Sequence, residues 1–245
     1  RDFLKTTGLG ATLISGGAWS ELAAKESKSL NEKLNIACVG TANRAAADVS
    51  GVKRENIVAL CDIDKNYLDR AAKQFPSART YADYRELIAK EGDKIDAVVV
   101  ATADHNHAPA SIRAIRAGKH VYCEKPLTYN IEEARIIRMA ARNANVVTQM
   151  GTQNHANDNY RRVVELIQSE TIGEVREVHV WHSRAWGWHE SEQAARKAKE
   201  RFMVIRTPKK SQPVPAGLDW DLWLGPAPAR PFHNHYFQGP IWYRW

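Results

Sequence analysis

The sequence has few cysteines, no repeat and no apolar run long enough to cross a bilayer. Its 245 residues include three cysteines, Cys38, Cys61 and Cys123. All three lie in or at the ends of predicted buried strands, so we expect free buried thiols and no disulfide framework. A transmembrane helix needs about 20 predominantly apolar residues, and no segment of this sequence provides them.

The sequence also lacks a convincing metal-binding cluster. His179 and His182 are three residues apart on a predicted strand, which points their side chains to opposite faces. His233 and His235 could share a face but have no clear carboxylate or cysteine partner. We therefore expect no metal.

A basic stripe on an ordered face, as nucleic-acid binding requires, is missing as well. The net charge is +7, but residues 184–245 carry 10 Lys or Arg against 5 Asp or Glu, so the preceding part is nearly neutral. We interpret the basic cluster of Arg196, Lys197, Lys199 and Arg201 as a solvated helix face and expect no nucleic-acid partner.

A nucleotide-binding turn is predicted after the first apolar segment. Residues 34–39 are β-prone and end at Gly40. The segment from Gly40 to Ala45 has the spacing of the glycine fingerprint, in which a helix N-terminus points its free N–H groups at a pyrophosphate. Ala45 is an accepted third residue, but Ala42 places a methyl group where the backbone approaches the phosphates most closely.

Asp62 follows the next predicted strand, residues 56–61, about 20 residues beyond the turn. A carboxylate there accepts hydrogen bonds from ribose hydroxyls and repels a 2′-phosphate, which favours NAD over NADP, although Arg44 could offset that repulsion. The alternative is a helix-capping Asp in an ordinary αβ turn.

The rest of the sequence alternates predicted strands and helices. Helices are predicted over 65–75, 83–90, 109–117 and 131–143, and strands over 95–100, 120–123 and 145–150. This alternation predicts an α/β fold with a doubly wound parallel (Rossmann-type) sheet, and one further strand is predicted over 174–182. We place a signal and linker in residues 1–30 and an NAD(P)-binding domain in residues 31–152.

Three segments, residues 101–108, 117–128 and 218–228, closely resemble the glucose-fructose oxidoreductase, inositol dehydrogenase and rhizopine-catabolism (Gfo/Idh/MocA) family. The second contains Glu124-Lys125-Pro126, and the third is rich in tryptophan, as in exported members. The resemblance implies an NAD(P)-dependent oxidoreductase that transfers a hydride from a sugar, polyol or related carbohydrate, and it implies a homo-oligomer for the complete protein. It also implies that residues 153–245 are the beginning of an α+β substrate domain, which is incomplete here.

The resemblance implies that Lys125 lies beside the nicotinamide and donates a hydrogen bond to the reacting hydroxyl, with Glu124 positioning the site and Pro126 following a cis bond. Gln153, Asn154 and His155 are expected to bind sugar hydroxyls. The predicted cofactor-binding residues are Gly40, Thr41, Ala42, Asn43, Arg44, Asp62, Thr102, Asp104, His107, Glu124, Lys125 and Pro126; the predicted catalytic residue is Lys125.

The sequence departs from the family in one respect. The family's general base is a histidine in an Asp-x-Gly-x-His-like segment after the Trp-Tyr-Arg-Trp motif, and this sequence ends at Trp245 of that motif. We interpret the chain as a fragment that binds NAD without necessarily turning it over. His105, His107 and His155 are candidates for a replacement base.

The N-terminus resembles the latter part of a twin-arginine signal, with Arg1 to Lys5 before an apolar, Gly-rich stretch over residues 6–18. We therefore expect export to the periplasm; the alternatives are a disordered N-terminus and a cytoplasmic protein.

Two other functions remain open. One is a glycoside hydrolase of the same superfamily that uses NAD transiently, and the other is a non-catalytic nucleotide- or sugar-binding module. The tryptophans Trp181, Trp186, Trp188, Trp220 and Trp223 could stack on sugar rings, but packing is the default interpretation.

Overall fold

The computed structural model describes residues 33–181, 191–197, 208 and 210–237. The predicted signal segment, His182, Trp186, Trp188 and the final Trp-Tyr-Arg-Trp motif lie outside the described residues.

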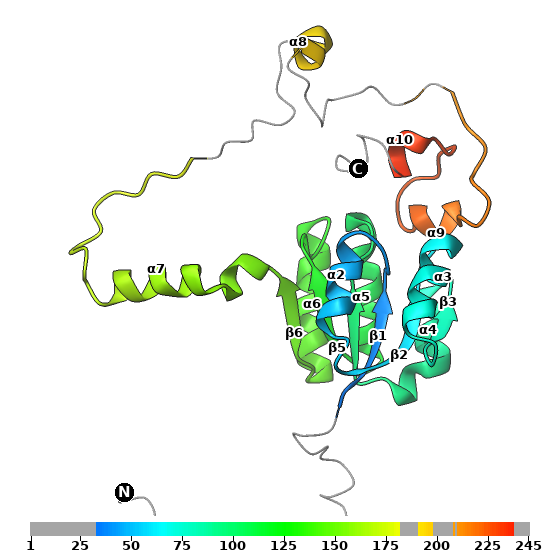
Figure 1. The fold of residues 1–245 in the computed structure, drawn as a ribbon, viewed down its shortest axis with the longest axis horizontal. Helices are drawn as coiled ribbons and strands as arrows, with labels where there is room; N and C mark the ends of the chain where they lie inside the picture. Colours follow the sequence, from blue (N-terminus) through cyan, green and yellow to red (C-terminus); the bar gives the residue numbers. More distant parts are fainter. Residues whose placement is uncertain (1–32, 182–190, 198–207, 209, 238–245) are drawn as a thin grey trace, which may run out of the picture. The chain divides into compact units, whose positions relative to one another are not determined.

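A six-stranded parallel sheet forms the centre of the nucleotide-binding part, with strand order β3-β2-β1-β4-β5-β6 (Figure 1). The strands are β1 (Asn35–Val39), β2 (Asn56–Cys61), β3 (Arg79–Tyr81), β4 (Ala97–Val100), β5 (His120–Glu124) and β6 (Thr148–Gly151). The helices between them are α2 (Arg44–Gly51), α3 (Lys65–Gln74), α4 (Tyr84–Glu91), α5 (His107–Arg116) and α6 (Ile131–Ala144), with 3-10 turns η1 (Gly92–Lys94) and η2 (Asp104–Asn106). This arrangement confirms the predicted Rossmann-type sheet.

The two faces of the sheet bury separate cores because side chains alternate along each strand. On one face, Ala37 and Val39 of β1 pack with side chains of α4, α5 and α6. On the other, Ile36 and Cys38 pack with α2 and α3. Helices therefore cover both faces, and ligands are expected beyond the carboxyl ends of the strands.

The three cysteines are free and buried, as predicted. Burial raises the pKa of all three thiols, to about 12 for Cys38 and about 11 for Cys123. They are core side chains and not nucleophiles.

A third apolar cluster is built by the segment that follows residue 210. It contains α9 (Trp220–Leu224) and α10 (Asn234–Phe237), and its buried residues are Leu218, Trp220, Trp223, Leu224, Phe232 and Tyr236. Trp220 and Trp223 stack with ring centroids 4.6 Å apart. The packing interpretation is therefore confirmed for these two tryptophans, whereas Trp181 is exposed.

This segment is attached to the end of β2. Leu218 forms an antiparallel bridge with Asp64, and the N–H of Asp219 donates to the carbonyl of Ile63 at 3.0 Å. The N–H of Lys65 donates to the carbonyl of Gly217 at 2.8 Å. Residues far apart in the sequence thus meet near Asp62.

Three predictions about elements need correction. Residues Glu174–Trp181 form no strand, since no neighbouring strand pairs with them within the described residues and Val178 and Val180 are exposed. Residues 79–81, for which no helix or strand was predicted, form the edge strand β3. α5 begins at His107, because Pro109 in the first turn needs no hydrogen-bonded N–H.

After β6 the chain continues through η3 (Gln153–Ala156) and α7 (Asp158–Gln168), and a short helix α8 (Glu192–Lys197) lies further on. In the described part of the chain, no helix is both long and apolar enough to cross a membrane.

Candidate functional site

The chain turns sharply at Gly40, directly after β1. Gly40 has a φ of +95°, and a Cβ atom there would lie 2.4 Å from the carbonyl oxygen of Ala101 and 3.3 Å from the Cβ of Ala45. Its N–H donates to the carbonyl of Cys61 at 2.8 Å. Only glycine fits this position, so the first glycine of the fingerprint is explained by sterics.

The start of α2 forms the anion-binding part of the turn. Asn43, the residue before α2, has φ 54° and ψ −117°, and its side chain makes no capping hydrogen bond. Ala42 is half-buried and Asn43 is exposed. The first N–H groups of α2 thus receive no acceptor from their N-cap, which leaves them suited to a phosphate at the positive end of the helix dipole.

Asp62 closes the turn from the neighbouring strand. Its Oδ2 accepts hydrogen bonds from the N–H of Thr41 at 2.9 Å and the Thr41 hydroxyl at 2.8 Å, and its Oδ1 accepts from the N–H of Asp64 at 3.0 Å. Burial raises the pKa of Asp62 above its ordinary value, although these hydrogen bonds oppose the rise. A carboxylate has about four acceptor positions, so three bonds leave capacity for a ribose hydroxyl.

Lys125 lies at the carboxyl end of β5. Glu124, the last residue of β5, is buried, whereas the Lys125 side chain is exposed. The N–H of Lys125 donates to Oε2 of Glu124 at 3.3 Å, and the Lys125–Pro126 peptide bond is cis, as the resemblance implies.

His107 links the loop after β4 to the loop after β5. Its Nδ1 lies 2.6 Å from the carbonyl oxygen of Pro126, and its Nε2 lies 3.0 Å from that of Thr102. The ring is almost completely buried. The structure therefore gives this side chain a positioning role between two backbone carbonyls, and it does not bring the ring to the surface as a replacement base or a cofactor contact.

His105 is also buried, in contrast to its expected place at the reaction site. Its Nε2 lies 2.7 Å from the carbonyl oxygen of Trp223, and the side-chain amide of Asn106 donates to the same oxygen at 2.9 Å. Burial lowers the pKa of His105, opposed by the Trp223 carbonyl and Asp104. η2 thus holds the tryptophan-rich segment, while Asp104 itself is exposed.

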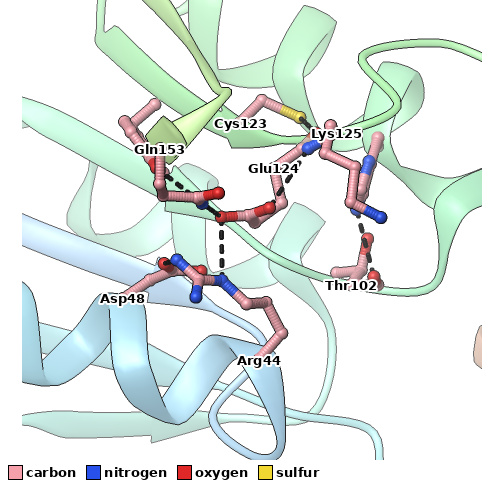
Figure 2. A network of polar contacts seen from close by, with 9 residues as sticks. Arg44, Asp48, Thr102, Cys123, Glu124, Lys125 and Gln153 are labelled. Carbon is pink, nitrogen blue, oxygen red and sulfur yellow. Dashed lines mark hydrogen bonds and ion pairs between the residues drawn. The ribbon is translucent and has the colours of Figure 1, made fainter. Parts of the chain in front are cut away.

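A polar network connects α2 to Glu124 (Figure 2). Nε of Arg44 donates to Oε1 of Glu124 at 3.0 Å, and its Nη2 donates to Oδ1 of Asp48 at 2.7 Å. The two carboxyl side chains are only 4% and 5% exposed. Because Arg44 faces these carboxylates, the structure gives no support to Arg44 as a partner for a 2′-phosphate next to Asp62.

Gln153 joins this network from η3. Its side-chain amide donates to Oε1 of Glu124 and to the Tyr122 hydroxyl. Asn154 and His155 follow on η3 and are exposed, and His155 stacks on Tyr160 with ring centroids 4.6 Å apart. The predicted substrate residues therefore begin beside the Glu124-Lys125 turn.

Sequence reasoning missed Asp48 and Gly225, which shape this edge, and it missed the contact of the Trp223 carbonyl with His105 and Asn106. A Cβ at Gly225 would lie 2.0 Å from Oδ1 of Asn106. Asp48 alone left a local signal, since it lies four residues after Arg44 on one helix.

Neither the surface cavities nor the grouping of metal-ligating side chains suggests a second functional site in the described part of the chain. Two surface cavities of about 390 and 440 Å³ are lined by residues of the 208–236 segment and by α5, and neither includes a predicted site residue. Within the described residues, no group of three or more His, Cys, Asp or Glu side chains is placed to hold a metal ion.

The carboxyl edge therefore brings together the uncapped start of α2, the Asp62 carboxylate and the exposed Lys125 side chain. The missing Cβ at Gly40 and the uncapped α2 fit a dinucleotide. Lys125 directly follows the last residue of β5, so it can supply a cationic hydrogen-bond donor at this edge.

Comparisons with known proteins agree with this geometry. The family model for the Gfo/Idh/MocA oxidoreductase family, NAD-binding Rossmann fold, matches residues 31–152, and the model for the C-terminal alpha/beta domain of the same family matches residues 161–245.

Among individual proteins, an inositol 2-dehydrogenase of Salmonella typhimurium is 32% identical over 145 residues, which are 58% of this chain and 41% of that protein. A 1,5-anhydro-D-fructose reductase of Ensifer adhaerens is 41% identical over 91 residues, 36% of this chain and 27% of that protein. The crystal structure of a myo-inositol 2-dehydrogenase from Lactobacillus plantarum superposes with a TM-score of 0.55 at 26% identity and covers 59% of this chain and 43% of that chain. The matches thus span less than half the length of these relatives.

Proposed function

Because this chain belongs to the Gfo/Idh/MocA family of oxidoreductases, we propose that it serves an NAD-dependent enzyme that oxidises or reduces a sugar or polyol. The observation that carries the proposal is the placement of Lys125 at the same sheet edge as the glycine turn and Asp62. Relatives named as inositol dehydrogenases and an anhydrofructose reductase support a cyclic, hydroxyl-rich substrate.

Each predicted residue has a distinct task in this proposal. The turn at Gly40 and the start of α2 bind the pyrophosphate, and Asp62 accepts from the ribose hydroxyls. NAD, when bound, accepts or supplies the hydride. In the oxidative direction the Lys125 ammonium would donate a hydrogen bond to the substrate oxygen and stabilise the negative charge on it, while the hydroxyl proton passes to water or to His155, the exposed one of the three candidate bases.

The substrate is held by neighbouring polar groups. Gln153 is fixed through its amide nitrogen to Glu124, so its carbonyl oxygen is the atom that it offers to a hydroxyl. Asn154 and His155 add exposed donors and acceptors on the same turn. This set favours a neutral, hydroxyl-rich ligand.

The proposal is tested by mixing the chain with NAD and a panel of cyclic polyols and sugars while following NADH absorbance. We expect absorbance to rise with at least one substrate and Lys125→Met to lower kcat by about 10²- to 10⁴-fold, the usual contribution of a positioned acid or base. Lys119→Met, which alters the preceding loop, is the control. NAD binding without any reduction across the panel would instead favour a non-catalytic binding module.

Export by the twin-arginine route and assembly as a homo-oligomer complete the proposal. The first rests on the pattern of residues 1–18, and the second on the family resemblance. Fractionation of cells that express the protein, followed by light scattering of the purified product, tests both; a cytoplasmic monomer would contradict them.

A further inference from the structure

The side chain of Arg44 connects three parts of the site that are distant in sequence. It begins α2 directly after the nucleotide-binding turn, yet its guanidinium points to Glu124, 80 residues further along the chain (Figure 2). The same guanidinium binds Asp48 one helical turn later. Arg44 is itself half-exposed, whereas both of its partners are buried.

Glu124 connects Arg44 to Lys125 and Gln153 through its two carboxylate oxygens. Its Oε2 accepts from the Lys125 backbone N–H, and its Oε1 accepts from both Arg44 and Gln153. Gly151 makes room for this arrangement, since a Cβ there would lie 2.6 Å from Oε1 of Glu124. The Glu124 carboxylate therefore contacts Arg44, the Lys125 backbone and the Gln153 side chain at once.

Asp48 adds a second buried carboxyl beside the first. Its Oδ2 is buried and has no hydrogen-bond partner within the described residues. Burial raises the pKa of Asp48, and Glu124 adds to the rise while Arg44 opposes it. A cation that contacts both members of a buried carboxyl pair offsets their mutual repulsion, and Arg44 supplies this cation.

We propose that Arg44 is a positioning residue, which holds Glu124 and, through it, Lys125 and Gln153 in the arrangement that the reaction needs. The inference rests on the proposed function, since it assigns Arg44 to the reaction end of the site and not to the dinucleotide phosphates. It makes a prediction that a phosphate ligand would not share: loss of Arg44 misplaces Lys125 but leaves NAD affinity largely intact.

The test measures NAD affinity and the exposure of Lys125 separately. Calorimetry gives the dissociation constant for NAD, and limited acetylation with mass spectrometry gives the rate at which the Lys125 amine reacts with and without saturating NAD. In the unaltered chain we expect NAD to slow acetylation of Lys125 about tenfold or more, as a bound ligand that covers the amine should.

For Arg44→Met we expect an NAD dissociation constant within about threefold of the unaltered chain, but protection of Lys125 below about twofold. Arg44→Lys keeps the charge but not the two-armed guanidinium, so its protection should be intermediate. Arg54→Met, an exposed arginine on the loop after α2, is the matched control and should change neither quantity.

Arg44→Met leaves two buried carboxyls without their cation, which could prevent folding. The double variant Arg44→Met/Asp48→Asn removes one of those charges and provides a second route to the same measurement. Either folded variant gives the answer.

The inference is overturned if these variants protect Lys125 as fully as the unaltered chain, or if they weaken NAD binding tenfold or more while protection at saturation persists. Failure of the proposed function appears in the unaltered chain itself, as absence of NAD uptake or of any protection of Lys125. That result would remove the inference as well.

Discussion

At the scale of single residues, we propose that Asp62 sets the preference for NAD over NADP. Its carboxylate is fixed by Thr41 and Asp64 in the orientation that a ribose needs, so little side-chain ordering remains to be done on binding. A 2′-phosphate would meet the partly buried negative charge of Asp62, and Arg44, at the start of α2, is engaged by Glu124 and Asp48.

Replacement of Asp62 by Asn should therefore weaken NAD binding by about 10- to 100-fold, the loss expected for a charged hydrogen bond, and narrow the preference over NADP. Competing titrations with NAD and NADP measure the change. Asp69→Asn, an exposed carboxylate on α3, should leave both affinities unaltered. Equal affinity for the two cofactors in the unaltered chain would contradict this account.

Local patterns in the sequence predicted the residues of the turn and of the strand ends. Gly40, Asp62 and Lys125 follow predicted strands, and strand ends of a parallel sheet share one edge. The pattern could not show that His107 is buried between two carbonyls, because its partners Thr102 and Pro126 meet only in the folded chain. Asp48 was missed for the same reason.

At the scale of elements, the contact between η2 and α9 joins two distant parts of the chain. Asn106 and His105 both face the carbonyl of Trp223, and Gly225 packs against the Asn106 amide. The two partners are more than 100 residues apart in the sequence, so local patterns could not predict their contact, and neither short helix was predicted. The prediction of a strand over 174–182 was wrong for a related reason. Alternating apolar residues show that a segment could form a strand, but they do not show that a neighbouring strand is there to pair with it.

Gly225→Ala should lower the free energy of unfolding by about 1–3 kcal/mol or more, because a methyl group at φ +52° collides with Asn106. Gly118→Ala is the matched control: its φ is +74°, but nothing lies within 4 Å of the added Cβ. Denaturant unfolding measures the loss of stability in both variants. The loss in Gly118→Ala gives the cost of a positive φ alone, and the additional loss in Gly225→Ala gives the cost of the collision with Asn106. Equal losses would show that the contact contributes nothing.

At the scale of the whole molecule, we expect His105 to make the free energy of unfolding depend on pH, because it is buried in the contact between η2 and α9. Its pKa is lowered below the ordinary value of 6.5, chiefly by burial. The folded protein therefore binds this proton less readily than the unfolded chain does. The contribution of neutral His105 to the free energy of unfolding is therefore complete above pH 6.5. It is lost as the pH falls through the lowered pKa of the folded state.

His105→Gln keeps an N–H donor for the Trp223 carbonyl but cannot titrate in this range. We expect the unaltered chain to lose stability between pH 6.5 and 5 more steeply than the variant, by at most about 1.4 kcal/mol per pH unit. Urea unfolding at a series of pH values measures both slopes. Parallel slopes would contradict the assignment.

The sequence predicted the parallel sheet, and the structure and the family model for an NAD-binding Rossmann fold agree with it. We infer that the carboxyl edge of this sheet binds NAD. Calorimetric titration of the chain with NAD tests it most directly: we predict saturable uptake of one NAD per chain, abolished or strongly weakened by Gly40→Val, with weaker binding of NADP. Absence of binding heat at millimolar NAD in the folded chain would contradict the account.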